Sequence, residues 1–369
     1  MNTLRTISAT VVILLFYVKF LLFRIWELEG TPITILDIFS YLFCLLSIDF
    51  RHVKYNIFWV FVFLGLSVFV SSARTLAFLF LILYALKDIS IRQIAAANLF
   101  CSIAIFAYLI FSIQLGLITD QVLITANGTE RYDLGMKNPN ILGLFAYGLC
   151  SNLYVLWGNR HKFITFSLIS LFGTWVYIHS GSRTFLFSIV LLLGLYLSYN
   201  NKHLSSPLFN KRMIMWLPFI FTGMTLLMAI AVQAVPALDI LFSFRFSYYN
   251  QLLTGSSGLQ LLIGNPMIDE IVIDSSYMHM AFRAGLLGYT LFAYIYYKGI
   301  KNTFGTDKYI FPLVISTLCY GITESLLFYT VVFNNMILWI FLFQHATNTF
   351  HNSSYSLKHE NRLLYSEHL

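Results

Sequence analysis

The chain has 369 residues, of which 58% are hydrophobic, 18% aromatic and only 11% charged. A soluble domain carries roughly 25% charged residues, so this composition excludes a water-soluble protein and predicts an all-α, polytopic membrane protein. The net charge of +7 does not indicate a nucleic-acid partner, because the basic residues occupy short connectors between apolar runs.

Apolar runs long enough to cross the roughly 30 Å hydrocarbon core of a bilayer recur along the whole chain. We expect about twelve transmembrane helices. They lie at residues 5–24, 33–49, 56–71, 74–87, 95–117, 140–157, 163–180, 184–199, 213–235, 277–297, 309–322 and 325–345. The split near residues 71–74 stays open, because one bent helix over 56–87 would lower the number by one. No small-residue cleavage site follows the first run, so we expect a retained helix and not a signal peptide.

The distribution of Lys and Arg predicts the orientation. With twelve spans, most of the 23 basic residues fall on the side of both termini, which is therefore expected to be cytoplasmic, together with a tail at 346–369. Two large connectors, 118–139 and 236–276, then lie outside, and residues 1–369 form a single integral-membrane domain. The four cysteines lie in apolar runs without paired spacing, which argues against disulfides and a metal site and fits a bacterial plasma membrane.

The remaining ionisable residues crowd the predicted outer side. Charge within a bilayer is costly and tends to mark functional sites, so the function is expected at the outer leaflet. These residues are Lys19, Arg24, Arg74, Arg131, Lys137, Arg183, Arg245 and Arg283, with Asp37, Asp133, Asp239, Asp274 and Glu324.

An amphipathic helix is predicted at the start of the second large connector, where apolar residues recur at three- and four-residue steps. They are Leu238, Leu241, Phe242, Phe246, Tyr249, Leu252 and Leu253. Arg245 points from the middle of this apolar face. A guanidinium placed there is suited to an anion, and the alternative is an interfacial arginine that extends towards lipid headgroups.

The turn His179-Ser-Gly-Ser-Arg-Thr184 joins two predicted spans. Gly181 permits a close turn, and Ser182 or Thr184 can cap the next helix. Arg183 stands at that helix N-terminus, which favours a phosphate. The alternative is a capped turn with an arginine that anchors at the interface.

Asn140, behind Asn138 and Pro139, opens the sixth span, and Gly143 permits the close approach of another helix. The alternative for this motif is a helix start without further function. Tyr249 and Tyr277 are candidates for stacking on sugar rings, although aromatic residues gather at membrane interfaces in any case.

His279 and Arg283 share one face of the tenth span, where an ion pair of Arg283 with Asp274 or Glu324 is the structural alternative to substrate binding. Glu324 lies at an outer turn and can either pair with an arginine or take a proton from a sugar hydroxyl. The sequence has no phosphate-binding Gly-rich loop and no paired-His metal motif, so no cofactor is expected and the substrate must arrive activated.

In their order along the chain, several of these landmarks resemble Wzy-type O-antigen and capsular-polysaccharide polymerases, to which the O-antigen ligases are related. The likeness covers residues 138–345. It rests on Asn138-Pro-Asn-Ile-Leu-Gly143, Ser180-Gly-Ser-Arg-Thr184, Arg245, Gly264-Asn-Pro266, Asp274-Ser-Ser-Tyr277, Ala284-Gly-Leu-Leu-Gly288, Gly321-Ile-Thr-Glu324 and Phe333-Asn-Asn335.

The resemblance implies a glycosyltransferase C-like membrane enzyme that uses no metal. Its substrate would be an oligosaccharide repeat unit on undecaprenyl diphosphate, and its partners would include membrane lipid, a flippase and a chain-length regulator. By position, Arg183 and Arg245 would hold the diphosphate with help from Arg283. Binding roles would extend to Ser182, Asn140, Tyr249 and Tyr277, and the base stays open among Asp274, Glu324 and His279.

Two other functions stay open. Ligases usually carry a histidine at the position of Asp274, and this difference argues against a ligase. A transporter or flippase for lipid-linked sugars would show charges at the membrane midplane and a repeat between its halves, whereas here the charges crowd one side.

Overall fold

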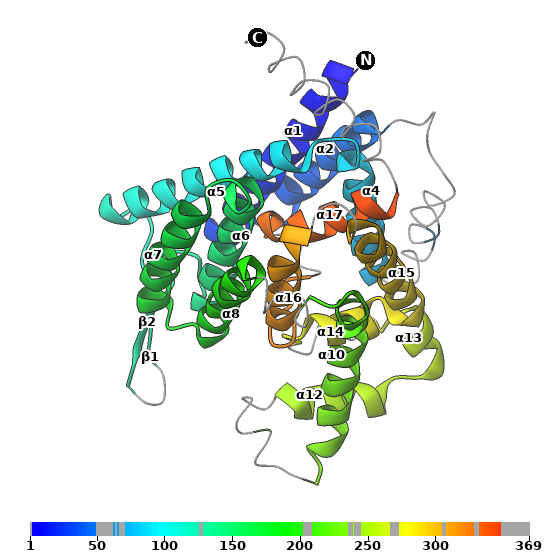
Figure 1. The fold of residues 1–369 in the computed structure, drawn as a ribbon. Coiled ribbons are helices and arrows are strands. Elements are labelled where there is room, and N and C mark those ends of the chain that lie inside the picture. The colour runs from blue at the N-terminus through cyan, green and yellow to red at the C-terminus, as the bar shows by residue number, and fades with distance from the viewer. Residues whose placement is uncertain are drawn as a thin grey trace.

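The computed structural model describes residues 2–48, 62, 65, 71–124, 128–201, 209–234, 239, 245–265, 273–304, 308–327 and 332–347, which are mostly helical. The first half contains α1 (Asn2–Phe20), η1 (Leu21–Ile25), α2 (Thr31–Ser47), α4 (Ser71–Leu86), α5 (Ile91–Gln114), β1 (Val122–Ile124), β2 (Glu130–Tyr132), α6 (Pro139–Trp157) and α7 (Lys162–Ser180). The second half contains α8 (Arg183–Asn200), α10 (Lys211–Ala231), α12 (Arg245–Gly255), α13 (Gly258–Ile263), α14 (Ser276–Met278), η5 (His279–Arg283), α15 (Gly285–Thr303), η6 (Lys308–Ile310), α16 (Phe311–Tyr320), η7 (Phe333–Met336) and α17 (Ile337–Ala346) (Figure 1).

Among the described residues, five helices are long and apolar enough to cross a membrane. They are Thr3–Ile25, Ile91–Gln114, Pro139–Trp157, Lys162–Ser180 and Lys211–Ala231. Large apolar side chains also point away from the protein, with Phe163 82% and Phe100 73% exposed. Such surfaces are suited to lipid and not to water, so the fold is that of an all-α protein embedded in a membrane.

Three central helices have the bounds predicted for residues 140–157, 163–180 and 184–199, to within one residue at each end. Local signals explain the accuracy. The Asn138 side chain caps α6 by accepting from the backbone N–H of Asn140 at 2.7 Å, and Gly181 ends α7 in the left-handed region with φ 56°.

Parts of the predictions lie outside the described residues. These parts are most of the predicted span 56–71, the positions of Leu238, Leu241 and Phe242, Pro266, and the tail beyond residue 347. The described part of the amphipathic helix is α12, whose buried face carries Phe246, Tyr249 and Leu252 as expected.

The predicted span at 277–297 is helical on both sides of a break, which lies between η5 and α15. Gly285, at the start of α15, has φ +61°, and a Cβ there would lie 2.5 Å from both the Gly264 nitrogen and the Leu262 carbonyl oxygen. The end of α13 therefore packs into the break, at a position where only glycine fits without strain. Because the residues on both sides of the break are apolar, the hydropathy of the sequence gives no sign of this close approach.

The predicted span at 325–345 is wrong in its first half. Ser325–Leu327 is not helical, and α17 begins only at Ile337, after the 3₁₀ turn η7. In η7 the side-chain amides of Asn334 and Asn335 donate to backbone carbonyls of α6 at 2.8 and 3.0 Å. These hydrogen bonds favour a turn packed against α6 over the straight helix that hydropathy alone predicts.

Neutral polar side chains join the helices in the interior. The Tyr17 hydroxyl of α1 donates to the Asn98 carbonyl of α5 at 3.0 Å, and the Asn98 amide donates to the Asn152 side chain of α6 at 3.2 Å. Asn152 in turn donates to the Asn334 carbonyl at 2.9 Å. Within a bilayer the hydrophobic effect does not drive helices together, because the lipid is itself apolar. Interhelical hydrogen bonds of this kind stabilise the packing instead.

A two-stranded hairpin stands within connector 118–139, where the sequence indicated only a loop. β1 and β2 pair antiparallel, with Leu123 opposite Arg131. The buried Asp133 closes its base by accepting from the backbone N–H groups of Gln121 and Gly135 at 3.1 and 2.8 Å. In Figure 1 this hairpin, α12 and the turns after α7 and α16 lie in the lower half of the view, whereas the N-terminus lies at the top.

Candidate functional site

Arg131 on β2 joins two of the segments that the sequence singled out. Its Nε donates to the Ser180 carbonyl at 2.7 Å, and its Nη2 donates to the Asn140 side chain at 2.8 Å. Gly181 makes room for it, because a Cβ there would lie 3.0 Å from the Arg131 Cγ. One guanidinium therefore holds the α7–α8 turn and the start of α6 together.

Arg183 begins α8 beside this anchor, and its side chain is exposed. Burial and then repulsion from Arg183 lower the pKa of Arg131. Ser182 occupies the N-cap position without a side-chain hydrogen bond, which corrects the predicted cap. It is buried against α6, where its Oγ lies 3.2 Å from the position of a Gly143 Cβ, so substrate does not reach it in this arrangement.

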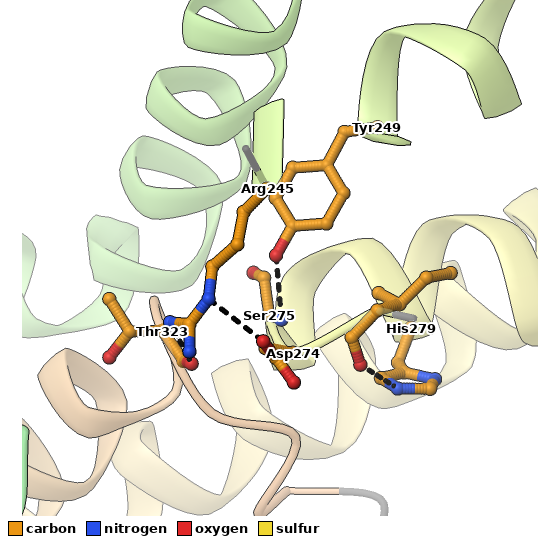
Figure 2. Close-up of polar contacts among 7 residues, drawn as sticks. Arg245, Tyr249, Asp274, Ser275, His279 and Thr323 are labelled. Atoms are coloured by element: carbon orange, nitrogen blue, oxygen red, sulfur yellow. Dashed lines mark hydrogen bonds and ion pairs between the residues drawn. The ribbon is translucent and has the colours of Figure 1, made fainter. Parts of the chain in front are cut away.

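Arg245 reaches from α12 to two other segments, as Figure 2 shows. Its Nε lies 2.8 Å from the Asp274 carboxylate, and its Nη1 donates to the Thr323 carbonyl at 2.9 Å. Of the two surroundings expected for Arg245, protein or lipid headgroups, the structure shows protein. The pairing of Asp274 differs from the expected alternative, since Asp274 joins Arg245 and not Arg283.

Glu324 follows Thr323 in the turn after α16 and is only 5% exposed. Its backbone carbonyl accepts from the Ser276 hydroxyl at 2.6 Å, which fixes the turn. Within the described chain its carboxyl makes no hydrogen bond and no ion pair. Burial raises the pKa of Glu324 to about 8, Arg245 and Arg131 oppose the rise, and Asp274 adds to it.

These interactions bring together residues from five separate segments of the chain. We call them the arginine–carboxylate cluster, which consists of Arg131, Arg183, Arg245, Asp274 and Glu324. Arg183 and Arg245 lie at the same end of the molecule and are linked through Arg131 and Glu324. The cluster combines excess positive charge with one carboxyl that titrates near neutral pH.

The two tyrosines expected to stack on sugars are buried instead. Tyr249 is 1% exposed, and its hydroxyl accepts from the Ser275 backbone N–H at 3.0 Å. Tyr277 is fully buried, and its hydroxyl donates to the Leu318 carbonyl at 2.8 Å. Neither ring offers an open face, so the structure gives both tyrosines a positioning role beside Asp274.

His279 and Arg283 lie at the two ends of η5. The Nε2 atom of His279 lies 2.6 Å from the Ile273 carbonyl oxygen (Figure 2). The imidazole thus fixes the backbone immediately before Asp274. This contact makes His279 a weaker candidate for the base than Glu324.

An apolar groove of about 370 Å³ runs between α10, the α12–α13 segment and η5–α15. Its walls include Leu226, Leu253, Leu262, Phe282 and Leu286. Leu253 belongs to α12, the helix that begins with Arg245, so one helix carries both a wall of the groove and a member of the cluster.

The fold and the cluster define a helical membrane protein with a charged site at one end of its helices. Within the parts of the chain described here, no group of three or more His, Cys, Asp or Glu is placed to hold a metal ion. Comparison with known proteins adds no relative, since no family model, curated protein or solved structure matches the chain.

Proposed function

We propose that the protein is a glycosyltransferase that polymerises oligosaccharide units carried on undecaprenyl diphosphate at the outer leaflet of a bacterial plasma membrane. The observation that carries this proposal is Glu324, a buried carboxyl without a hydrogen-bond or ion-pair partner in the described chain, whose pKa is influenced by two arginines, Arg245 and Arg131. Joining a sugar hydroxyl to a sugar diphosphate needs a base for the hydroxyl proton and cations for the leaving group.

The reaction assigns a role to each charge. A hydroxyl oxygen of the acceptor unit attacks the anomeric carbon of the donor chain, whose bond to the diphosphate oxygen breaks. The bonding electrons leave with the lipid diphosphate, and the hydroxyl proton passes to the Glu324 carboxylate. Arginines stabilise the negative charge that develops on the leaving group, without a metal.

Glu324 suits the base better than the other two candidates. Asp274 is held by Arg245 at 2.8 Å, and His279 lies against the Ile273 carbonyl. A carboxyl with a pKa of about 8 is also well matched to proton transfer near neutral pH.

The position of the site supports the proposal. The cluster lies at the end of the helices that the Lys and Arg distribution places outside, which is where a flippase would deliver the substrate. The apolar groove beside α12 offers a place for the polyprenyl chain. The landmark resemblance to Wzy-type polymerases points the same way.

A ligase and a transporter are the alternatives. The buried contacts Tyr17–Asn98, Asn98–Asn152 and Asn334–Ser102 join helices through neutral side chains, whereas a transporter for lipid-linked sugars would be expected to carry charge in such places.

The content of lipid-linked sugars in a strain that lacks the protein separates these functions. Loss of a polymerase leaves single repeat units on the lipid at the outer leaflet. Long lipid-linked chains would indicate a ligase, and single units confined to the inner leaflet would indicate a flippase; either result would overturn the proposal.

A further inference from the structure

A second groove, which we call the α10–α15 groove, lies between these two helices and has a volume of about 380 Å³. Trp216 on α10 and Tyr294 and Tyr297 on α15 form part of its wall, and they are 61%, 52% and 45% exposed. The groove is near the start of α10. The arginine–carboxylate cluster is at the other end of this helix, where Asn250 of α12 donates to the Ala229 carbonyl at 2.8 Å.

Two hydrogen bonds between α10 and α15 fix the shape of the groove. The Tyr296 hydroxyl donates to the Ile214 carbonyl at 2.6 Å, and the Tyr289 hydroxyl donates to the Thr222 hydroxyl at 2.9 Å. Most of the lining residues lie between these two bonds in the sequence, within 215–219 on α10 and 290–294 on α15. The walls are therefore formed in advance, and an occupant does not have to order them.

Lysine side chains lie at the end of the groove where α10 begins. The Nζ atoms of Lys211 and Lys308 lie 5.8 and 5.1 Å from the centre of the Phe304 ring. The Nζ atom of Lys298 lies 5.5 Å from the centre of the Tyr294 ring, which is part of the groove wall. Within the described residues none of the three lysines makes an ion pair. Their charge is therefore not neutralised by a carboxylate there.

The sequence around this end is poor in acidic residues. Residues 200–216 contain no Asp or Glu, and residues 290–312 contain only Asp307, which lies outside the described residues. Arg212 and Lys301 add two exposed cations. Lysines are common on the cytoplasmic side of membrane proteins, where the charge distribution places this end. The apolar groove directly beside these lysines is the additional feature, and the combination matches a molecule with an anionic head and an apolar tail.

We propose that the α10–α15 groove binds an anionic phospholipid of the predicted cytoplasmic leaflet. The headgroup phosphate lies at Lys211, Lys298 and Lys308, whose ammonium groups donate to its oxygens. An acyl chain lies in the groove against Trp216 and Tyr294, in a position suited to aromatic side chains at a membrane interface. The site is independent of the proposed glycosyl transfer, because it lies at the other end of α10 from the cluster.

Quenching of tryptophan fluorescence by lipids with brominated acyl chains tests the site, since bromine quenches an indole that it contacts. The full-length protein is reconstituted in phosphatidylcholine bilayers that contain a small, equal fraction of brominated phosphatidylglycerol or brominated phosphatidylcholine. The difference between the natural protein and Trp216→Phe isolates the signal of Trp216, which lines the groove. Phosphatidylglycerol should quench this signal more strongly. Equal quenching by the two lipids would overturn the proposal, because it would show only general contact with the bilayer.

The lysines are tested by removing their charge. Lys298→Gln should lower the preference for phosphatidylglycerol by about fivefold, as expected for one basic residue beside an anionic lipid. The triple variant Lys211→Gln/Lys298→Gln/Lys308→Gln should abolish the preference. Arg160→Gln removes one charge from the same predicted side, in the exposed α6–α7 connector, and is the matched control. An equal loss in Arg160→Gln, or a preference that survives the triple variant, would contradict a site built by these lysines.

The groove is tested separately with Ala293→Phe, which fills it without changing the charge. This variant should weaken the quenching by phosphatidylglycerol, and undiminished quenching would place the acyl chain elsewhere. Inorganic phosphate should leave the quenching unchanged, whereas its reversal by phosphate would assign the lysines to a free anion and overturn the lipid. Each variant is first compared with the natural protein by its thermal unfolding midpoint, and the comparison of the two lipids on the natural protein needs no substitution at the lysines.

Discussion

At the scale of single residues, burial decides what Glu324 can do. A carboxyl in water is ionised at neutral pH, but Glu324 is 5% exposed and its pKa is raised to about 8. One pH unit below its pKa, roughly a tenth of a carboxyl is ionised. Arg245 and Arg131 limit the rise, so the arginines that favour an anion also keep this carboxyl titratable.

If Glu324 is the base, the rate of polymerisation should rise with pH and level off above about 8, because only the carboxylate accepts the proton. Glu324→Gln should lose about a hundredfold or more of the rate at every pH. Initial rates measured between pH 6 and 9 check both points. A pH-independent rate over this range, or an active Gln variant, would show that another group takes the proton.

The same pKa has a consequence for stability. The folded-state pKa of about 8 exceeds the ordinary value of 4.5, so the folded protein holds this proton more tightly than the unfolded chain does. The stabilisation is complete below pH 4.5 and is lost as the pH rises through 8. Glu324→Gln should therefore unfold at a temperature equal to or above that of the natural protein at pH 8.5, and a lower midpoint would contradict the assigned burial.

At the scale of elements, local signals and tertiary contacts account for different features. The ends of α6 and α7 follow from Asn138, Pro139 and Gly181, whose effects act within a few residues. The break before α15 and the 3₁₀ turn η7 depend on distant partners, the end of α13 and the backbone of α6. Hydropathy cannot reveal such partners, which is why both runs read as straight helices.

The break before α15 can be tested with Gly285→Ala. The positive φ alone costs about 1–3 kcal/mol for alanine, and the new Cβ would meet backbone atoms at 2.5 Å. We expect a clearly lower thermal unfolding midpoint. Gly223→Ala in α10, where a Cβ meets nothing within 4 Å, is the matched control and should be neutral or stabilising by about 1 kcal/mol. Equal midpoints for the two variants would argue against the packed break.

At the scale of the whole molecule, the crowding of charge at one side was predictable and the contacts within it were not. Sequence placed Arg131 among the outer arginines, but its bonds to Ser180 and Asn140 cross between segments that only the fold brings together. The pair Arg245–Asp274 was missed for the same reason. Arg245 begins α12 and Asp274 follows α13, so both helices lie between the two residues in the sequence.

The orientation of the site can be tested with single introduced cysteines. Gln251→Cys on α12 should react with a membrane-impermeant thiol reagent in intact cells, and Arg160→Cys should react only after permeabilisation, because the two exposed positions lie on opposite predicted sides. The natural Cys44, Cys101 and Cys150 are buried and give little background. The reverse labelling pattern would place the cluster in the cytoplasm.

The central claim is that the cluster joins lipid-diphosphate-linked sugars, and reconstitution tests it most directly. The purified protein is incubated with an undecaprenyl-diphosphate-linked repeat unit, excess chelator and no nucleotide, and the products are separated by size. A ladder of chains with one released lipid diphosphate per bond formed is the predicted result. Unchanged substrate with the natural protein, or a ladder made equally well by Glu324→Gln, would contradict the account.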